Sequence, residues 1–61
     1  MDDRIEMLLK YCEKHKDKYI EYWDKEEGEG AGIESYNALC DFIEGGIIRS
    51  KDDLAEYGMI E

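Results

Sequence analysis

Apolar residues recur at helical spacing through the first 26 positions of the chain. The stretch 3–26 contains no Gly or Pro and is rich in Leu, Met, Lys and Glu, which lose little rotamer freedom in a helix. At about 100° per residue its apolar side chains gather on one side, with Lys16 as the only intruding charge. This pattern predicts one long helix. Its buried face comprises Ile5, Leu8, Leu9, Cys12, Tyr19, Ile20 and Trp23.

A glycine-rich acidic segment, residues 27–32, interrupts this pattern. Three glycines raise the cost of a continuing helix and the clustered carboxylates repel each other, so we predict the hinge of a helical hairpin. Residues 33–44 predict a second amphipathic helix, ended by Gly45 and Gly46. Its apolar side groups Ile33, Tyr36, Leu39, Cys40 and Ile43, opposite Glu34, Asn37, Asp41 and Glu44.

The last part of the chain predicts a third, short helix. Residues 47–48 form an apolar bridge that we expect to be extended. Ser50 begins a capping-box pattern in which Ser50 and Asp53 each accept a hydrogen bond from the other's backbone N–H. The helix is predicted over residues 51–57, and Gly58 closes it.

Helix lengths decide how these elements pack. At 1.5 Å per residue the first helix spans ~35 Å and the second ~18 Å, so the second cannot cover the first. We expect the second helix to pair with residues 12–23, and the apolar residues of the C-terminal part to cover the N-terminal half. Those residues are Ile47, Ile48, Leu54 and Met59. The sequence predicts an all-α fold, a single small domain over 1–61, with a long N-terminal helix packed against two shorter helices.

The charge is strongly acidic and unevenly distributed. The 61 residues carry a net charge of −9, of which residues 1–26 contribute −2 and residues 27–61 contribute −7. Binding to nucleic acid or to an anionic membrane needs a basic footprint, so this composition disfavours both. It favours a protein partner with a basic surface.

Two features bear on the cellular compartment. Cys12 and Cys40 belong to no Cys-x-x-Cys pair and fall at apolar helix positions, so we expect two buried, reduced thiols. The N-terminus is charged, and no apolar run approaches the length of a membrane span. We therefore expect a cytoplasmic protein with no membrane segment.

The residue types that carry chemistry are sparse. His15, the only histidine, has no predicted carboxylate or serine partner, and neither cysteine has a neighbouring base to activate it. A zinc site built from Cys12, His15 and Cys40 lacks a fourth ligand. The glycines of residues 28–32 follow no strand and precede no lysine, so they predict a turn and not a phosphate loop. We expect no catalytic residues, no metal, no cofactor and no enzymatic activity.

The leading hypothesis is a small acidic regulator that binds a protein. A row of carboxylates at helical spacing resembles duplex phosphates in charge density, so it suits the basic cleft of a nucleic-acid-binding protein. Inhibitors of this kind are encoded by phages and mobile elements. The partner-binding residues that we predict are Glu34, Asp41, Glu44, Asp52 and Asp53, with Tyr36 or Tyr57 as aromatic anchors.

Two alternatives remain at this stage. One is a self-associating structural or adaptor module, in which leftover apolar surface and the lysine row of the first helix form a homodimer. The other is a helix-turn-helix DNA-binding accessory protein with residues 51–57 as the recognition helix. That helix carries Asp52, Asp53 and Glu56 against the single base Lys51, a balance that DNA would repel.

Overall fold

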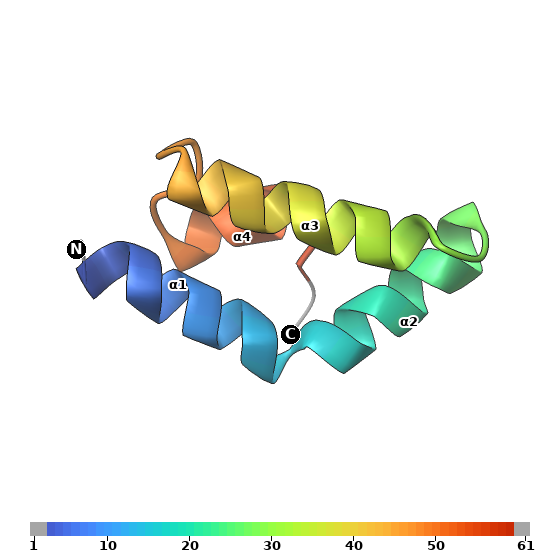
Figure 1. Ribbon diagram of the computed structural model, residues 1–61. Coiled ribbons are helices and arrows are strands. Elements are labelled where there is room, and N and C mark those ends of the chain that lie inside the picture. The colour runs from blue at the N-terminus through green and yellow to red at the C-terminus, as the bar shows by residue number, and fades with distance from the viewer. Residues whose placement is uncertain (1–2, 60–61) are drawn as a thin grey trace.

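Four helices form the regular structure of residues 3–59, the part of the chain that the computed structural model describes (Figure 1). They are α1 (Asp3–Lys14), α2 (Lys16–Glu27), α3 (Ala31–Glu44) and α4 (Lys51–Glu56). These residues contain no strand, so the predicted all-α fold is confirmed. Within the same range, no helix combines the length and the apolar character that crossing a membrane requires.

The chain bends at His15, which separates α1 from α2 (Figure 1). The prediction of one continuous N-terminal helix is therefore wrong. At the bend the His15 N–H is shared between the carbonyl oxygens of Tyr11, at 3.3 Å, and Cys12, at 3.1 Å, which tightens one turn. Between Cys12 and Tyr19 the predicted apolar side of the sequence carries no apolar residue, only Lys16. In a straight helix Lys16 would face the core. In the bent chain Lys16 stays exposed, with Nζ 5.2 Å from the centre of the Tyr36 ring.

Helices α2 and α3 form the predicted hairpin, joined by residues 28–30. Their backbones meet at Gly32, where an added Cβ would lie 2.7 Å from Ile20 Cα. The Gly32 N–H donates to Asp24 Oδ1 at 2.8 Å. A carboxylate on α2 thus caps the N-terminus of α3, where the N-cap residue Gly30 has no side chain to do so.

The turn after α3 directs only one of two consecutive isoleucines into the core. Gly46, with φ +81°, closes the helix in a Schellman motif, in which the Ile47 N–H donates to the Phe42 carbonyl oxygen at 2.9 Å. Ile48 is then 1% exposed and Ile47 is 55% exposed. The expectation that both would cover the N-terminal half is wrong for Ile47. Residues 47–48 are not the extended bridge that we expect from the sequence: both N–H groups bond to the Phe42 carbonyl oxygen in a turn that leaves Ile47 at the surface.

The cap of α4 follows half of the predicted pattern. Ser50 Oγ accepts a hydrogen bond from the Asp53 N–H at 3.3 Å. Asp53 Oδ2 accepts from the Arg49 N–H at 2.9 Å, and not from Ser50 as predicted. The short aspartate side chain thereby ties the residue before the cap to the first turn of the helix.

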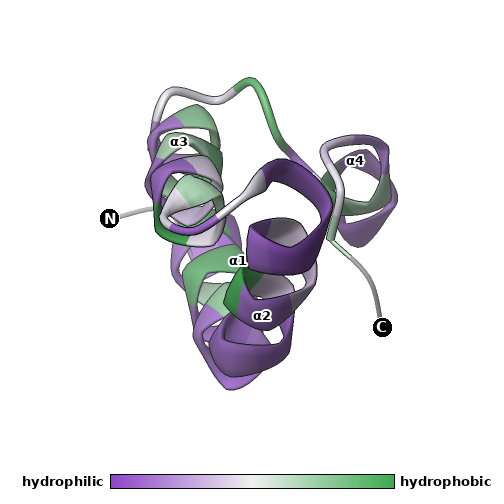
Figure 2. Ribbon diagram, turned by 90° about the vertical axis from the view of Figure 1, so that its right-hand side faces the viewer, coloured by the Kyte–Doolittle hydropathy of each residue, from purple (hydrophilic) through white to green (hydrophobic). Residues whose placement is uncertain are grey.

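The core draws side chains from all four helices and the segments around α4. It comprises Leu8, Cys12, Tyr19, Tyr36, Leu39, Ile43, Ile48, Leu54 and Met59. The end view in Figure 2 shows α3 and α4 on two sides of the molecule, with α1 and α2 below and between them. Ile33, predicted on the apolar side of its helix, is 51% exposed. That prediction is wrong because the neighbouring Gly32, not Ile33, faces α2.

Candidate functional site

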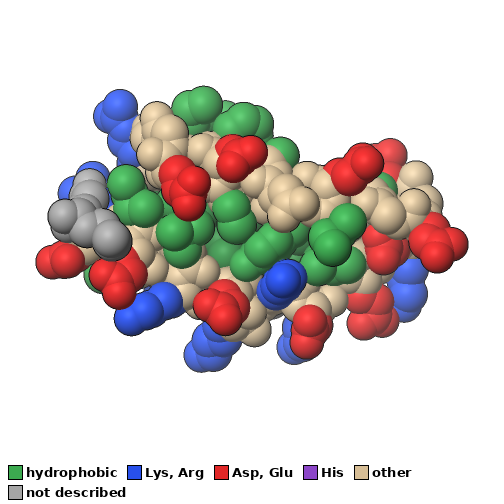
Figure 3. Space-filling view, viewed as in Figure 1, with side chains coloured by type: hydrophobic (Ala, Val, Ile, Leu, Met, Phe, Trp, Pro, Cys, Tyr) green, Lys and Arg blue, Asp and Glu red, His purple; other side chains and the backbone are tan. Residues whose placement is uncertain are grey.

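The outer side of α3 is an acidic face, formed by Glu34, Asp41 and Glu44. All three side chains are exposed, and intervals of seven and three residues bring them to the same side of a helix. Figure 3 shows carboxylates along α3, and others along α1 and α2 with lysine or arginine side chains among them. The sequence of α3 contains no lysine or arginine. By contrast, lysines of α1 and α2 pair with acids of their own helix, Lys10 with Glu6 and Lys25 with Glu21, each at 3.3 Å.

Beside the acidic face lies an aromatic groove, a hollow of about 410 Å³ between α2 and α3 that Tyr57 bounds after α4. Its walls carry Tyr19, Trp23, Leu39, Phe42 and Tyr57, and Glu27 and Glu34 also line it. On α3 the lining residues Ala31, Ser35 and Ala38 recur at intervals of four and three positions. Because these side chains are small, α3 leaves space here that larger residues would fill.

Ring contacts and one hydrogen bond hold the walls of the groove in place. Trp23 Nε1 donates to the Gly58 carbonyl oxygen at 3.1 Å, which ties α2 to the turn after α4. The rings of Phe42 and Tyr57 lie 5.3 Å apart, and those of Tyr22 and Trp23 meet edge to face at 5.2 Å. The groove is therefore part of the fold of the chain itself.

The structure divides the predicted site residues between four places. Glu34 and Tyr57 both line the aromatic groove, and Asp41 and Glu44 continue along the acidic face. Asp52 is exposed on α4, and Asp53 is half-buried within the α4 cap. Tyr36 is only 8% exposed.

The Tyr36 ring is buried in the interior of the protein. It meets the Tyr19 ring edge to face at 6.0 Å and lies under the Lys16 ammonium. Burial raises the pKa of its hydroxyl to about 12. Of the two predicted aromatic anchors, Tyr57, at 42% exposure, has the surface that a partner needs.

Sequence reasoning did not assign Trp23, Phe42 or Glu27 to a binding site. Trp23 falls on the apolar face of the first predicted helix, so it was assigned wholly to the core, whereas it is half-buried and lines the groove. The signal available in the sequence is the set of small residues on one side of the second helix, Ala31, Ser35 and Ala38. Where small residues on one helix face a large aromatic residue on the neighbouring helix, the helices leave a groove between them.

Cys12 and Cys40 form no disulfide with each other. Cys12 is buried as predicted, whereas the prediction of a buried thiol is wrong for Cys40, which is half-buried. Cys12 is 0% exposed, and burial, with the nearby Cys40 adding to it, raises the pKa of the Cys12 thiol to about 11. The thiol is therefore protonated at neutral pH and a poor nucleophile. Among residues 3–59, no group of three or more His, Cys, Asp or Glu side chains is arranged to hold a metal ion.

We expect Cys12 to make the protein less stable in alkali. Its folded-state pKa lies above its ordinary value of 9.0, so its contribution is complete below pH 9 and is lost as the pH rises toward about 11. The loss is on the order of 2 kcal/mol, at ~1.4 kcal/mol per pKa unit. Urea unfolding at pH 8 to 11 measures it. Cys12→Ala should lose less free energy of unfolding over this window, and equal losses in both proteins would contradict the assignment.

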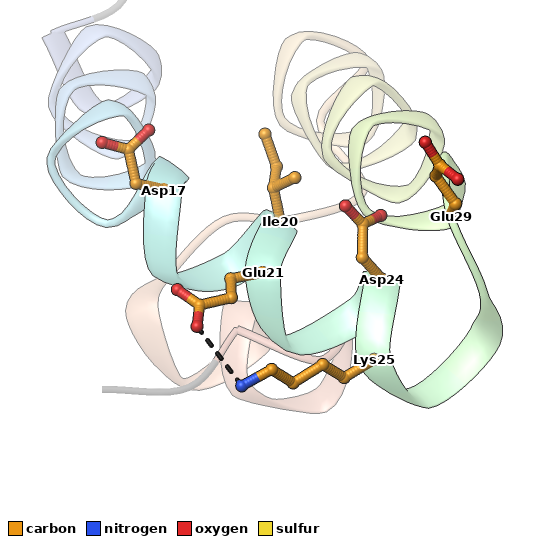
Figure 4. A pocket seen from close by; sticks show the side chains of 6 residues that line it. All are labelled: Asp17, Ile20, Glu21, Asp24, Lys25 and Glu29. Atoms are coloured by element: carbon orange, nitrogen blue, oxygen red, sulfur yellow. Dashed lines mark ion pairs between the residues drawn. The ribbon is translucent and has the colours of Figure 1, made fainter.

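A second hollow, of about 430 Å³, lies along α2 toward the hairpin loop (Figure 4). Four carboxylates line it, but they do not converge. Glu21 pairs with Lys25, and Asp24 accepts the Gly32 N–H. Asp17 and Glu29 lie at opposite ends of the view. The hollow is a charged surface depression without the geometry of a cation site.

No family model matches the chain, and comparison with curated proteins and with solved structures gives no significant match.

Proposed function

We propose that the protein is a small acidic regulator that binds a protein partner through that partner's basic surface. The observation that carries the proposal is α3, which presents Glu34, Asp41 and Glu44 on one exposed side and contains no lysine or arginine of its own. A surface charged in this way attracts and orients a basic partner.

The partner class that fits best is a nucleic-acid-binding protein. Glu44 follows Glu34 by ten positions, so the acidic face places three charges within roughly 15 Å of helix. Their mean axial spacing is about 7 Å, roughly twice the ~3.4 Å between successive phosphates of one DNA strand. By occupying a phosphate-binding cleft, the protein would act as an inhibitor that mimics nucleic-acid charge, as proteins of phages and mobile elements do.

Release of proteins from immobilised DNA tests this proposal. A cell extract is loaded on DNA-cellulose, and proteins are eluted at constant ionic strength with the wild-type chain or with one of two variants. The first variant is Asp41→Lys/Glu44→Lys, and the second is Glu13→Lys/Asp17→Lys. The second variant changes net charge equally at exposed sites on α1 and α2. We expect wild type and the second variant to release the same proteins, and the first to release them at least about tenfold less effectively, because opposed like charges cost several kcal/mol. No release by wild type, or equal release by both variants, contradicts the proposal.

Self-association is the second candidate, and exposed apolar surface favours it. Met7 is 66% exposed, Ile33 51% and Ile47 55%. Figure 3 shows hydrophobic side chains between α3 and the α1 and α2 pair. A dimer at micromolar concentration whose sedimentation does not change with salt would support a structural or adaptor module in place of an electrostatic regulator.

Helix-turn-helix binding to DNA has less support. On α4 the side chains of Asp52 and Glu56 are exposed, and the one base of the helix, Lys51, is also exposed but turns Nζ toward the Tyr11 ring, 4.7 Å from its centre. The outward side of this short helix is therefore acidic, which opposes approach to a duplex.

A further inference from the structure

We propose that the aromatic groove receives an amphipathic basic helix of the partner protein. This inference rests on the proposed function and assigns to it a docking site and the kind of segment that binds there. The groove follows two helices of a hairpin, which is the arrangement into which a third helix packs.

The shape of the groove suits a helix of about three turns. On α2 the lining residues are Tyr19, Trp23 and Glu27, which recur every fourth position. On α3 they extend from Ala31 to Phe42, roughly 16 Å of helix. A volume of about 410 Å³ lies within the usual 300–1,000 Å³ of ligand sites, and it accommodates a few apolar side chains spaced at i, i+3 or i+4, and i+7.

The charges beside the groove select a basic segment. Glu27 at the end of α2 and Glu34 in the first turns of α3 both line the groove, near the hairpin loop. Glu29 adds a further carboxylate to that loop. Phe42, farther along α3, and Tyr57, after α4, border the other end of the groove and bring no charge. We infer that lysine or arginine of the partner helix lies at the loop end, and that its apolar side chains extend toward Tyr57.

The walls of the groove are in place before binding. The Trp23 indole is fixed by its hydrogen bond to Gly58, and the Tyr57 ring packs against Phe42. Preformed walls lower the ordering cost of association.

Trp23 is the only tryptophan of the chain, so its fluorescence reports directly on the groove. The probe is a synthetic peptide of about 14 residues, ~four turns, made of leucine and lysine with the leucines on one helical face. We expect binding to shift Trp23 emission to shorter wavelength, because the peptide excludes water from the indole. A peptide of the same composition in scrambled order, which has no apolar face, should bind at least about tenfold more weakly.

Filling the groove provides the matched test. Ala38→Phe places a ring in the groove, whereas Asn37→Phe adds the same ring at the adjacent exposed position. Far-UV circular dichroism establishes that both variants remain helical. Ala38→Phe should weaken binding of the amphipathic peptide at least about tenfold, and Asn37→Phe should leave it within about twofold of wild type.

The outcomes separate this inference from the proposed function. Equal binding of the two peptides, or unchanged binding by helical Ala38→Phe, overturns the groove as a docking site. If, in that case, the Asp41→Lys/Glu44→Lys variant no longer releases proteins from DNA-cellulose, the proposed function is supported and only the docking site in the groove is rejected. If the Asp41→Lys/Glu44→Lys variant releases proteins as wild type does, but Ala38→Phe no longer binds the peptide, the docking site in the groove is supported and binding through the acidic face is rejected.

Discussion

Replacing Gly32 with Ala is expected to lower the free energy of unfolding by several kcal/mol and to leave much of the chain unfolded. The added Cβ would overlap the Ile20 backbone and lie 2.7 Å from its Cα. Backbone atoms cannot rotate away as a side chain does, so α2 and α3 would have to separate. Overpacking costs about 1–3 kcal/mol or more, whereas a domain of this size has only ~3–5 kcal/mol of stability.

Urea unfolding followed by far-UV circular dichroism measures this effect. Gly45→Ala is the matched control, because Gly45 has φ −81° and an added Cβ would meet only the Asp41 carbonyl oxygen, at 3.2 Å. We expect the control to remain within about 0.5 kcal/mol of wild type. A Gly32→Ala protein as stable as the control would show that the two helices do not cross so closely.

Gly58→Ala is expected to cost about 3 kcal/mol and to release Trp23 from its place in the groove. Gly58 has φ +94°, and a side chain in this left-handed conformation costs about 1–2 kcal/mol. An added Cβ would also lie 2.6 Å from Trp23 Cζ2. The indole must therefore move, and it loses the hydrogen bond from Nε1 to the Gly58 carbonyl oxygen.

Gly46→Ala separates the two causes. Gly46 has φ +81°, but an added Cβ there would meet nothing within 4 Å, so this variant isolates the backbone strain. We expect Gly46→Ala to lose about 1–2 kcal/mol with unchanged Trp23 emission, and Gly58→Ala to lose more and to shift the emission to longer wavelength. Equal losses in both variants would argue against the contact between Gly58 and Trp23.

Local patterns were sufficient to predict the helical fold. The glycines after residue 27, the pair before Ile47, and Ser50 each mark a helix boundary through their own conformational preference. The observed ends of α3 and α4 lie within two residues of those predicted. The bend at His15 has no such mark, since neither Gly nor Pro is present there. With the bend, α1 and α2 both contact α3 while Lys16 stays exposed, an arrangement that depends on the tertiary structure and not on the local sequence.

Contacts between distant residues limited the prediction of the candidate site. From the sequence alone, Asp24 is indistinguishable from the other solvated acids of its helix. Its hydrogen bond from the Gly32 N–H depends on where α3 lies in the fold. Likewise, the sequence pattern places Trp23 in the core, and only the folded structure shows that its indole Nε1 donates to the Gly58 carbonyl oxygen. The charges of α3 follow from helical spacing alone, so Glu34, Asp41 and Glu44 were predicted together. The groove beside them depends on how two helices and a turn meet.

The dependence of partner affinity on salt tests the central claim most directly. For a protein released from DNA-cellulose, the affinity of the wild-type chain should fall at least about tenfold between 50 and 200 mM salt, because several ion pairs form at the acidic face. Asp41→Lys/Glu44→Lys should bind weakly at low salt and lose this dependence. Affinity that is flat with salt in the wild-type protein, or the same in both proteins, would contradict binding through the acidic face of α3.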